Sequence, residues 1–499
     1  MTMKKRFLLL CSLLLLILLT ACRNGSEFDP DQETDSTDAA TSDNESESTE
    51  ITSGEVIDPS YTENELGLEF QLSEDGKSYI LSSGQNCNAE NVIIPAEFQG
   101  LPVTEIGEWA FASCMMKSVT IGSSVTVIGG STFDSCHRLT SIVIPDSVEL
   151  IGVGAFCASA LESVTIGAGV RTIAVEAFCS TNLKKVVIPS SVEVIGEVAF
   201  SGCDQLEEVV IQDGVKRIEQ WAFRDCKRLK TVILPNTLEY MEAETFRESP
   251  SIEYNIYQGM KYLGSQTNPY FALVGSDGGT RLVPHLDTVF YMSKALYDCE
   301  DIVSVEVGSN VQFIGYGALG GMDALEEITV HPDNKYYYVV NNILFEKSTN
   351  LPIQGCKTSV IPSDGSITEI DLEIFNSIAT IETIHIPKGI KKFELSFQFM
   401  SGLKSIIIET DVEHIVNSGN HCGCISRKEA CSLTVYHCHI AEQWENVEVE
   451  YTFKKIGIHP IDCYGDYATH YFYSETKPTE EGNYWHYVGG VPTPWEEAA

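Results

Sequence analysis

The chain of 499 residues exceeds the size at which single hydrophobic cores stop growing, so it contains either several domains or a repeat array. Its 71 acidic and 32 basic side chains give a formal net charge of -39, which repels nucleic-acid phosphates. The composition therefore argues against a nucleic-acid partner, and only the arrangement of residues along the chain can separate the two architectures.

The N-terminus carries the features of an export signal. Three basic residues, Lys4 to Arg6, precede an apolar run over residues 7–19 that is too short to span a bilayer in the mature protein. The run ends in Leu-Thr-Ala-Cys, and this ending resembles the lipobox of bacterial lipoproteins, whose cysteine receives a diacylglycerol and becomes the new N-terminus. The resemblance implies lipidation of Cys22 and a protein anchored outside the cytoplasmic membrane. A plain signal peptide with a chance cysteine is the alternative.

An acidic segment follows this cysteine. Residues 23–60 contain twelve Asp or Glu and one Arg, together with many Ser and Thr. Such a composition cannot bury enough apolar surface to offset the entropy of ordering. We expect residues 22–60 to form a disordered, self-repelling tether.

A repeat of 22 or 23 residues dominates the rest of the chain. It is marked by an aliphatic residue at Ile106, Ile128, Ile151, Ile173, Ile195, Ile218 and Met241. A Phe follows five residues after each, and we expect the first six of these to form an apolar spine: Phe111, Phe133, Phe156, Phe178, Phe200 and Phe223. One such unit buries too few side chains to fold alone, so the units must stack.

Each unit also contains a Leu-x-x-Val-x-Ile element, as in "LESVTIG" (161–167) and "LKKVVIP" (183–189), whose alternation has the period of a β-strand. Residues 195–212, "IGEVAFSGCDQLEEVVIQ", closely match the Ile-Gly-x-x-Ala-Phe-x-x-Cys-x-x-Leu-x-x-Ile-x-Ile-Pro pattern. The chain thus resembles the BspA-like leucine-rich repeat family. The resemblance implies a solenoid with a parallel β-sheet on its concave face, short turns or helical segments on the convex side, hairpin insertions and a β-rich C-terminal cap.

Interruptions of the repeat suggest a domain division. "FQLSEDGKSYILSSG" (70–84) is typical of a hairpin with an Asp-Gly turn, and we expect it to cap the first unit. The expected segments are a signal peptide (1–21), the tether (22–60), an N-terminal cap (61–102), a first repeat array (103–254), an insertion (255–290), a second array (291–411) with its own insertion (331–350), and a Cys/His- and aromatic-rich C-terminal region (412–499).

The strand pattern also predicts which side chains face outward. In Leu-x-x-Val-x-Ile the Val and Ile point into the core, so the residues just before them lie on the outer face. The face selected in this way is small, hydroxyl-rich and β-branched, and its candidate binding residues are Ser141, Val143, Thr165, Val187, Val210 and Ile233. Residues of these types also simply suit a sheet. A partner-binding face is the functional alternative, because exposed apolar strips with polar rims are common contact sites.

A cysteine recurs three residues after the spine Phe. The position holds Cys114, Cys136, Cys203, Cys226 and Cys299, but also Ser249, Met322, Ile378 and Met400. Because a thiol is not required there, we expect these cysteines to fill space in the wall of the solenoid rather than to catalyse a reaction or bind metal. In two shorter units the cysteine instead follows the Phe directly, as Cys157 and Cys179.

The C-terminal region offers two further candidate sites. Thiols and imidazoles cluster at Cys422, Cys424, Cys431, Cys438, His437 and His439. They could be reduced and structural, form disulfides, or hold zinc, although Cys-x-Cys is not the usual spacing of a zinc knuckle. Farther on, Trp485, Tyr487 and Trp495 could stack on sugar rings or form a hairpin that caps the last repeat.

The sequence contains no motif of a known catalytic class, such as His-Glu-x-x-His, Gly-x-Ser-x-Gly or a phosphate-binding loop. We therefore expect a non-catalytic protein without a cofactor. The family resemblance implies adhesion to a host or bacterial surface, with an unidentified protein or glycan as partner and the membrane as the site of the lipid anchor.

Overall fold

The computed structural model describes residues 61–63, 67–85, 89–242, 244–297, 299–395, 400–409, 412–417, 433–438, 447–451, 468–479, 482–489 and 491–495. All of them belong to one compact unit, Asp58–Ala499. The described residues form a parallel β-solenoid of about 14 turns with almost no helix, which confirms the predicted fold class. None of them lies in a helix with the length and apolar character needed to cross a bilayer.

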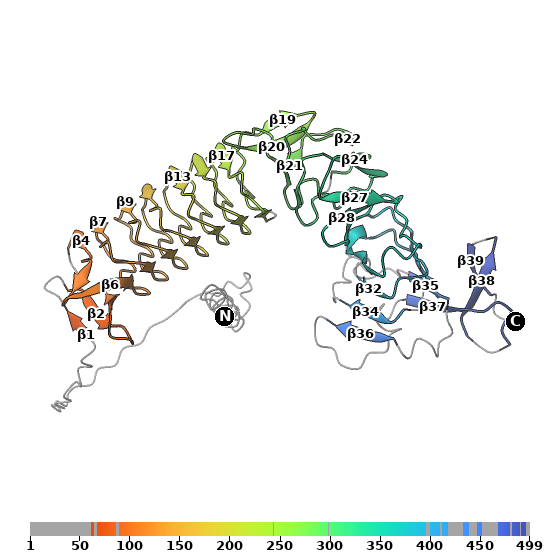
Figure 1. The fold of residues 1–499 in the computed structure, drawn as a ribbon, viewed down its shortest axis with the longest axis horizontal. Helices are drawn as coiled ribbons and strands as arrows, with labels where there is room; N and C mark the ends of the chain where they lie inside the picture. Colours follow the sequence, from red (N-terminus) through yellow and green to blue (C-terminus); the bar gives the residue numbers. More distant parts are fainter. Residues whose placement is uncertain are drawn as a thin grey trace, which may run out of the picture. The chain divides into compact units, whose positions relative to one another are not determined.

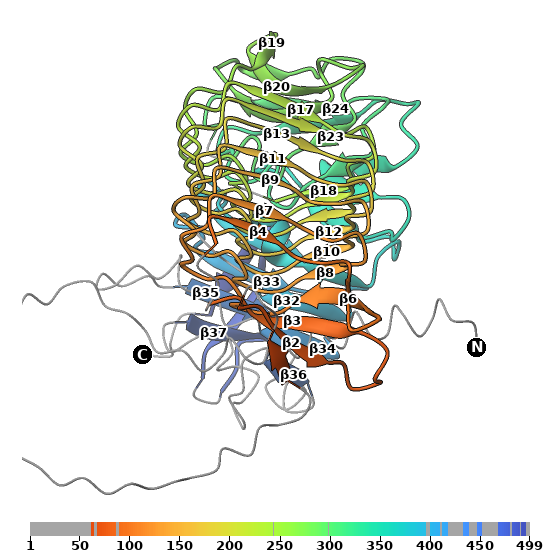
Figure 2. The ribbon, with the colours of Figure 1, turned by 90° about the vertical axis from the view of Figure 1, so that its left-hand side faces the viewer.

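Each turn of the first array contributes two strands. The longer strands arise from the Leu-x-x-Val-x-Ile elements and are β4 (Asn91–Ile93), β7 (Ser118–Thr120), β9 (Ser141–Val143), β11 (Ser163–Thr165), β13 (Lys185–Ile188), β15 (Glu208–Ile211) and β17 (Thr231–Leu234). The second set ends at the aliphatic residue that marks each repeat, and we call its members the short strands because all of them except the six-residue β6 have two residues. They are β6 (Leu101–Ile106), β8 (Val127–Ile128), β10 (Leu150–Ile151), β12 (Thr172–Ile173), β14 (Val194–Ile195), β16 (Arg217–Ile218) and β18 (Tyr240–Met241). The second set forms one continuous parallel ladder from β6 to β18. The first set also stacks in parallel, but its backbone pairing divides it into β4–β7, β9–β11 and β13–β15–β17. Figure 2 shows the two sets as two columns.

The two ladders are joined by corners in the left-handed backbone region rather than by helices. The residue three positions after the marker aliphatic has a positive φ, as at Trp109 (60°), Glu176 (58°) and Val198 (59°). The residue two positions after the spine Phe does so too, as at Ser180 (55°). Bonds between turns support these corners, for example from the Phe156 N–H to the Ala177 carbonyl (2.8 Å). The family resemblance implied either turns or helical segments between the sheet strands, and in this array the structure has turns.

The spine phenylalanines lie in one continuous stack. The rings of Phe111, Phe133, Phe156, Phe178, Phe200, Phe223 and Phe246 follow one another at centroid separations of 5.1–5.7 Å with planes within 15° of parallel. All except Phe246 are fully buried. The stack runs along the interior of the first core cluster, where each ring covers a face of the next.

The recurring cysteines lie beside this stack and form hydrogen bonds. Cys136, Cys203 and Cys226 are fully buried, and each thiol donates to the carbonyl of the spine Phe in the preceding turn, at 3.1–3.3 Å. Ser249 occupies the same position and donates to the Phe223 carbonyl at 3.0 Å. Burial raises the pKa of the Cys203 thiol to about 11, so the sulfur stays protonated and unreactive. These thiols fill space in the core, and each also donates a hydrogen bond to a backbone carbonyl of the preceding turn.

Antiparallel strands begin the solenoid. β1 (Tyr61–Glu63) pairs with β2 (Glu69–Leu72), which forms a hairpin with β3 (Tyr79–Ser83) around Gly76. β3 then pairs in parallel with β6, so the hairpin continues the ladder of short strands. β5 (Glu97–Phe98) pairs with β6 from the other direction. These strands thus cover the first turn at the N-terminal end of the solenoid.

The first insertion is built into the ladders rather than projecting from them. It contains β19 (Asn255–Tyr257), β20 (Met260–Ser265) and β21 (Ala272–Ser276), which pair antiparallel in sequence order. β20 extends the ladder of long strands beyond β17, and β21 leads into β23 (Phe290–Tyr291) of the short-strand ladder. Figure 1 shows β19 to β21 directly after the stacked strands that end at β17.

The second array repeats the two-ladder plan. Its long strands are β22 (Arg281–Leu282), β24 (Ser304–Val307) and β26 (Glu327–Val330), and the short-strand ladder continues through β25 (Phe313–Ile314). The second insertion then forms an antiparallel sheet of β27 (Tyr337–Val340), β28 (Ile343–Glu346) and β29 (Pro352–Gln354). A 3-10 helix, η2 (Leu372–Phe375), follows β30 (Glu369–Asp371).

Two further parallel ladders begin at β30 and β31 and extend past residue 411. One contains β30, β32 (Lys392–Leu395), β34 (His414–Asn417) and β36 (Glu448–Tyr451). The other contains β31 (Thr383–Ile386), β33 (Ser405–Ile408), β35 (Leu433–His437), β37 (Ala468–Tyr473) and β38 (Tyr484–Val488), and β39 (Val491–Pro494) folds back on β38. The C-terminal strands thus add turns to the solenoid, and the β38–β39 hairpin follows the last of them.

Candidate binding surface

The outer face of the long strands carries two straight rows of side chains. Neighbouring strands pair in register, as Val187 with Val210 and Val210 with Ile233, so equivalent residues of successive turns lie side by side. One row, which we call the apolar row, is Ile93, Thr120, Val143, Thr165, Val187, Val210 and Ile233. The other, the polar row, is Asn91, Ser118, Ser141, Ser163, Lys185, Glu208 and Thr231.

The apolar row leaves large aliphatic groups in water. Val143 is 64% exposed, Ile93 60% and Val187 40%, whereas the alternating residues Ile142 and Val186 are buried in the core. Val210 and Ile233 are half-buried. The row ends where Ile233 pairs with Gly264 of the first insertion. Its β-branched side chains have few rotamers, so a partner that packs against them loses little side-chain entropy.

Charged pairs border this face. Lys117 lies 2.7 Å from Glu90, and Arg138 lies 3.3 Å from the same carboxylate. Two turns on, Lys184 pairs with Glu162 at 2.6 Å. The hydrogen bond from Lys117 and its positive charge lower the pKa of Glu90, so this edge stays ionised. Exposed pairs of this kind add little stability, but they place fixed charges next to the polar row, on the side away from the apolar row.

Six residues of this face were named from the sequence, and the structure brings all six together. Val143, Thr165, Val187, Val210 and Ile233 lie in the apolar row, and Ser141 lies in the adjacent polar row. Asn91 and Ile93 begin the two rows and were missed. They lie in the predicted cap, where "NVIIP" already shows the strand alternation that would have identified them.

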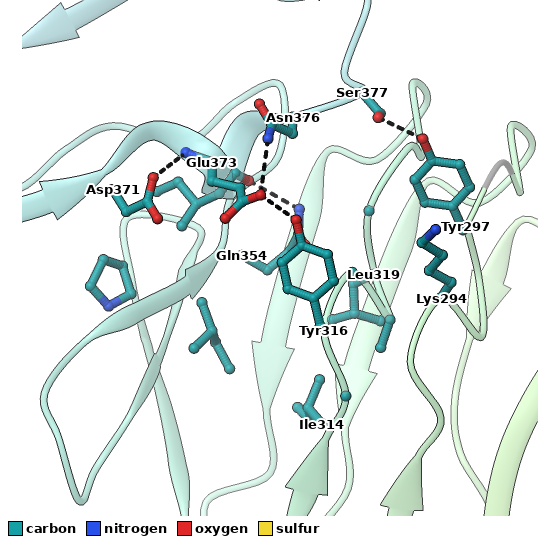
Figure 3. Close-up of a pocket in the computed structure, with 17 residues that line it drawn as sticks. Lys294, Tyr297, Ile314, Tyr316, Leu319, Gln354, Asp371, Glu373, Asn376 and Ser377 are labelled. Carbon is teal, nitrogen blue, oxygen red and sulfur yellow. Dashed lines mark hydrogen bonds between the residues drawn. The ribbon is translucent and has the colours of Figure 1, made fainter. Parts of the chain in front are cut away.

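A pocket of about 350 Å³ lies in the second array, where the spine is interrupted (Figure 3). Leu319 occupies the spine position in one core cluster and Phe375 in the next, and the β27–β29 insertion separates their turns in the sequence. Ile314, Leu319 and Ile374 supply apolar lining. Nothing in the regular repeat pattern predicts such a pocket, because it depends on the insertion.

The rim of this pocket is polar. Tyr316, 60% exposed, donates a hydrogen bond to Glu373, and the hydroxyls of Tyr297 and Ser377 lie 2.8 Å apart. Lys294 lies on the same side, its Nζ 5.6 Å from the Tyr297 ring centroid. In Figure 3, the carboxylate of Glu373 and the hydroxyl of Tyr316 point toward one another. An aromatic ring, an ammonium and a carboxylate at one opening suit a small polar molecule.

The carboxyl of Asp371 also lines this pocket. Burial raises its pKa to about 7, and the charges of Glu394 and Glu373 act in the same direction. Its Oδ1 accepts a hydrogen bond from the Glu373 N–H at 2.8 Å and thereby caps η2. The side chain therefore has a structural role at the start of the helix as well as a place in the pocket lining.

The C-terminal aromatics divide into core and surface. Trp485 is fully buried, and its indole N–H donates to the His437 carbonyl at 2.8 Å. Trp495 stacks on His486 at 3.5 Å and donates to the Ser474 carbonyl. The interpretation of Trp485 as a sugar-stacking residue is therefore wrong, because neither face of its ring reaches solvent. The hairpin position of these residues agrees with the capping alternative.

Other aromatic side chains take the outward positions on these strands. Tyr436 and Tyr471 pair across β35 and β37 with ring centroids 5.7 Å apart, and both are half-buried. Tyr487 is 40% exposed and donates a hydrogen bond to Glu409. We call Tyr436, Tyr471 and Tyr487 the aromatic patch. Of the three, only Tyr487 was named from the sequence.

The Cys/His cluster is only partly within the described residues. Cys422, Cys424, Cys431 and His439 lie outside them, as do Cys22 and the acidic tether. The buried His437 places its Nε2 2.9 Å from Nδ1 of His470 and stacks on Phe472. Across the residues that the structure describes, no three His, Cys, Asp or Glu side chains are grouped to hold a metal ion. Zinc binding by this cluster thus remains a prediction.

Comparison with known families identifies the repeat. The model of the BspA type leucine rich repeat region matches residues 82–181, 171–268 and 291–424 in six copies, which together make up more than half of the chain. A search of curated proteins finds no match to this chain.

Several solved structures are similar in fold. A leucine-rich cell surface protein of Faecalibacterium prausnitzii is 22% identical, with 80% of this chain and 99% of that chain covered and a TM-score of 0.40. A leucine-rich repeat protein of Bacteroides ovatus is 21% identical, with 77% and 98% covered and a TM-score of 0.37. The pneumococcal vaccine antigen PcpA is 16% identical, with 80% and 99% covered and a TM-score of 0.36.

Proposed function

Because the chain belongs to the BspA-type leucine-rich repeat family, we propose that it is a non-catalytic cell-surface protein that binds another protein through the outer face of its long strands. Proteins of this family are typically extracellular surface proteins, and the repeat is a scaffold that is generally not catalytic. The single observation that carries the proposal is the apolar row, from Ile93 to Ile233, exposed on a rigid sheet.

The composition of this face supports a protein partner. A sheet that faces only water gains nothing from exposing Val143 and Ile93, whereas an apolar strip with a polar rim is typical of contact sites. The adjacent polar row offers hydroxyls, and the Lys185–Glu208 pair, at 2.9 Å, interrupts it with both signs of charge. Such a surface can bury an aliphatic centre and satisfy polar groups around it.

The test compares matched substitutions on two different faces of the same repeat array. Val143→Lys with Val187→Lys places two charges in the apolar row, and we expect binding to immobilised extracellular-matrix proteins and to host epithelial cells to weaken about tenfold or more. The control, Val153→Lys with Val175→Lys, changes two valines on the corners that are 44% and 38% exposed. Equal losses in both variants, or no loss in the first, would contradict the proposal. Biolayer interferometry on the immobilised proteins and flow cytometry on the cells supply the measurements.

We further propose that Cys22 carries a lipid that holds the protein on the outer face of the cytoplasmic membrane, with residues 22–60 as the tether. The support is the sequence around Cys22. Cys22→Ser should move the protein from the membrane fraction to the medium without changing its thermal unfolding. Membrane retention of this variant would count against the lipid anchor.

A second candidate function is glycan binding through the aromatic patch. Tyr436 and Tyr471 present neighbouring ring faces, and the exposed Tyr487 lies on the same sheet beside Glu409. Tyr471→Ser with Tyr487→Ser should abolish signal on a glycan array if this patch binds sugars. Binding to immobilised proteins should survive, because the apolar row is unchanged. A retained glycan signal would exclude the patch as the site.

A further inference from the structure

Two cysteines occupy equivalent positions in adjacent turns of the first array. Cys157 and Cys179 each follow a spine Phe directly, and the rings of Phe156 and Phe178 stack at 5.1 Å. The backbone is in register here, because the Ala158 N–H donates to the Cys179 carbonyl at 2.8 Å. Equivalent residues in such a ladder lie about one strand spacing, 4.8 Å, apart. The backbones of Cys157 and Cys179 are therefore neighbours on one corner of the solenoid.

No other neighbouring turns of this array share a thiol at this position. The column immediately after the spine Phe reads Ala112, Asp134, Cys157, Cys179, Ser201, Arg224 and Arg247. Both cysteines are half-buried and reachable from solvent, unlike the sealed Cys136, Cys203 and Cys226. The pair thus combines two features that Cys136, Cys203 and Cys226 lack, namely partial exposure to solvent and a neighbouring cysteine outside the core.

The two thiols also affect each other's ionisation. Cys157 is the main cause that lowers the pKa of the Cys179 thiol to about 6, and Cys179 in turn raises the pKa of Cys157. The Cys179 sulfur lies 3.5 Å from the Ser180 hydroxyl. A thiolate is the reactive form of cysteine, and here it lies beside a second thiol.

We propose that Cys157 and Cys179 form a redox-sensitive pair that a small organic disulfide converts into a bridge between two adjacent turns. The Cys179 thiolate attacks one sulfur of the small disulfide, forms a mixed disulfide and releases one small thiolate. Cys157 then loses its proton to solvent and attacks the Cys179 sulfur, and a second small thiolate leaves. The two cysteines lose two electrons and two protons, and the small disulfide is reduced to two thiols.

The geometry of the ladder is compatible with this bridge. Disulfides join Cα atoms about 4.4–6.8 Å apart, a range that contains the spacing of in-register parallel strands. In the structure both thiols are free. Residues 157 and 179 lie on the corners that follow β10 and β12, whereas the apolar row lies on the long strands. The bridge would fasten two turns together without covering the proposed protein-binding face, so it does not depend on that proposal.

The test uses the full chain, reduced, freed of reductant and then exposed to oxidised glutathione. After the remaining thiols are alkylated, trypsin cleaves at Arg138, Arg171 and Lys184 and places the two cysteines in separate peptides, 139–171 and 172–184. We expect mass spectrometry to find these peptides linked by a disulfide that dithiothreitol releases. Alkylation by iodoacetamide at neutral pH should also be at least about tenfold faster at Cys179 than at Cys203.

Two variants control the experiment. Cys157→Ser should leave Cys179 only as a glutathione adduct, because no second thiol can displace the glutathione. Cys203→Ser, at a sealed wall position, should form the linked peptides as the native chain does. The proposal is overturned by glutathione adducts at both positions without the link, by a link that forms only in urea, or by equally fast oxidation of Cys136, Cys203 and Cys226.

Discussion

A single spine side chain shows how the solenoid is stabilised. Phe200 is fully buried between Phe178 and Phe223, each 5.2 Å away, and the thiol of Cys226 donates to its carbonyl. The same residue therefore takes part in the stack and in the hydrogen bonds between turns. Loss of its ring would leave a cavity bounded by two other rings that the ladder holds in place, so the site cannot collapse easily.

Phe200→Ala should accordingly lower the free energy of unfolding by about 3–5 kcal/mol, measured by denaturant titration. Phe246→Ala is the matched control. Its ring ends the stack, is half-buried and has one stacking neighbour at 5.7 Å, so we expect a smaller loss. If both variants lost the same free energy of unfolding, stacking between the rings would not determine the cost of removing a spine phenylalanine.

Val198 is an exception among the residues at the left-handed corners. Its φ is 59°, a region that is costly for a β-branched residue. The equivalent positions in other turns hold residues without a branch at Cβ: Trp109, Ser131, Gly154, Glu176, Trp221 and Glu244. Val198→Asn should therefore raise the free energy of unfolding by about 1 kcal/mol. Val175→Asn, at an exposed valine of the preceding turn outside this region, should bring no gain. A loss of stability in Val198→Asn would show that packing of the valine outweighs its backbone strain.

Among the elements, the short helix η2 depends on a carboxyl that is costly to ionise. Asp371 caps the helix, and burial raises the pKa of its carboxyl from 3.8 to about 7. The folded state then binds this proton more tightly than the unfolded state between about pH 4 and 7. The contribution of Asp371 to stability is therefore greatest below pH 4 and falls as the pH rises to 7.

Asp371→Asn removes this pH dependence and keeps an oxygen that can accept the Glu373 N–H. We expect the variant to gain up to about 4 kcal/mol over the native chain at pH 8 and to equal it at pH 4, as thermal unfolding at the two values would show. Asp364→Asn is the control, because Asp364 is exposed and a hydrogen bond from Ser366 lowers the pKa of its carboxyl. A gain at pH 4 as large as at pH 8 would exclude the ionisation of Asp371 as the cause.

The elements differ in how far the sequence could predict them. Four alternating residues around Val186 and Val209 were enough to locate the long strands and the outward residues of the proposed face. The short strands, such as Val194–Ile195, were missed because two residues show no alternation. Pairing of β20 with β17, the pocket beside Glu373 and the burial of Trp485 depend on contacts between distant segments, which a local pattern does not encode.

For the whole molecule, the consequence of stacking is that each turn contacts mainly its neighbours. Strand β12, for example, pairs directly with β10 of the turn before it and with β14 of the turn after it. Stability is then close to a sum over turns and their interfaces, as in other solenoids. The length of the array should be adjustable in whole turns.

Deletion of residues 174–195 tests this directly. It removes one turn of 22 residues, joins Ile173 to Gly196 and places Phe156 next to Phe200 in the stack. We expect a soluble monomer with a parallel-β circular dichroism spectrum and a cooperative transition, at a somewhat lower temperature. Deletion of residues 174–184, half a turn, should give an unfolded or aggregated chain, because both ladders and the stack lose register. Similar behaviour of the two deletions would refute whole-turn modularity.

The same ladder determines how the molecule responds to mechanical load. Adjacent turns are joined by short parallel ladders such as Val194–Ile195 with Arg217–Ile218, so tension along the stack loads them one after another rather than all together. Each turn that peels away releases 22 or 23 residues, about 75 Å of extended chain. Under tension along this axis the protein should lengthen in repeated steps of one turn and keep its remaining turns folded, so that it absorbs force gradually instead of failing at once.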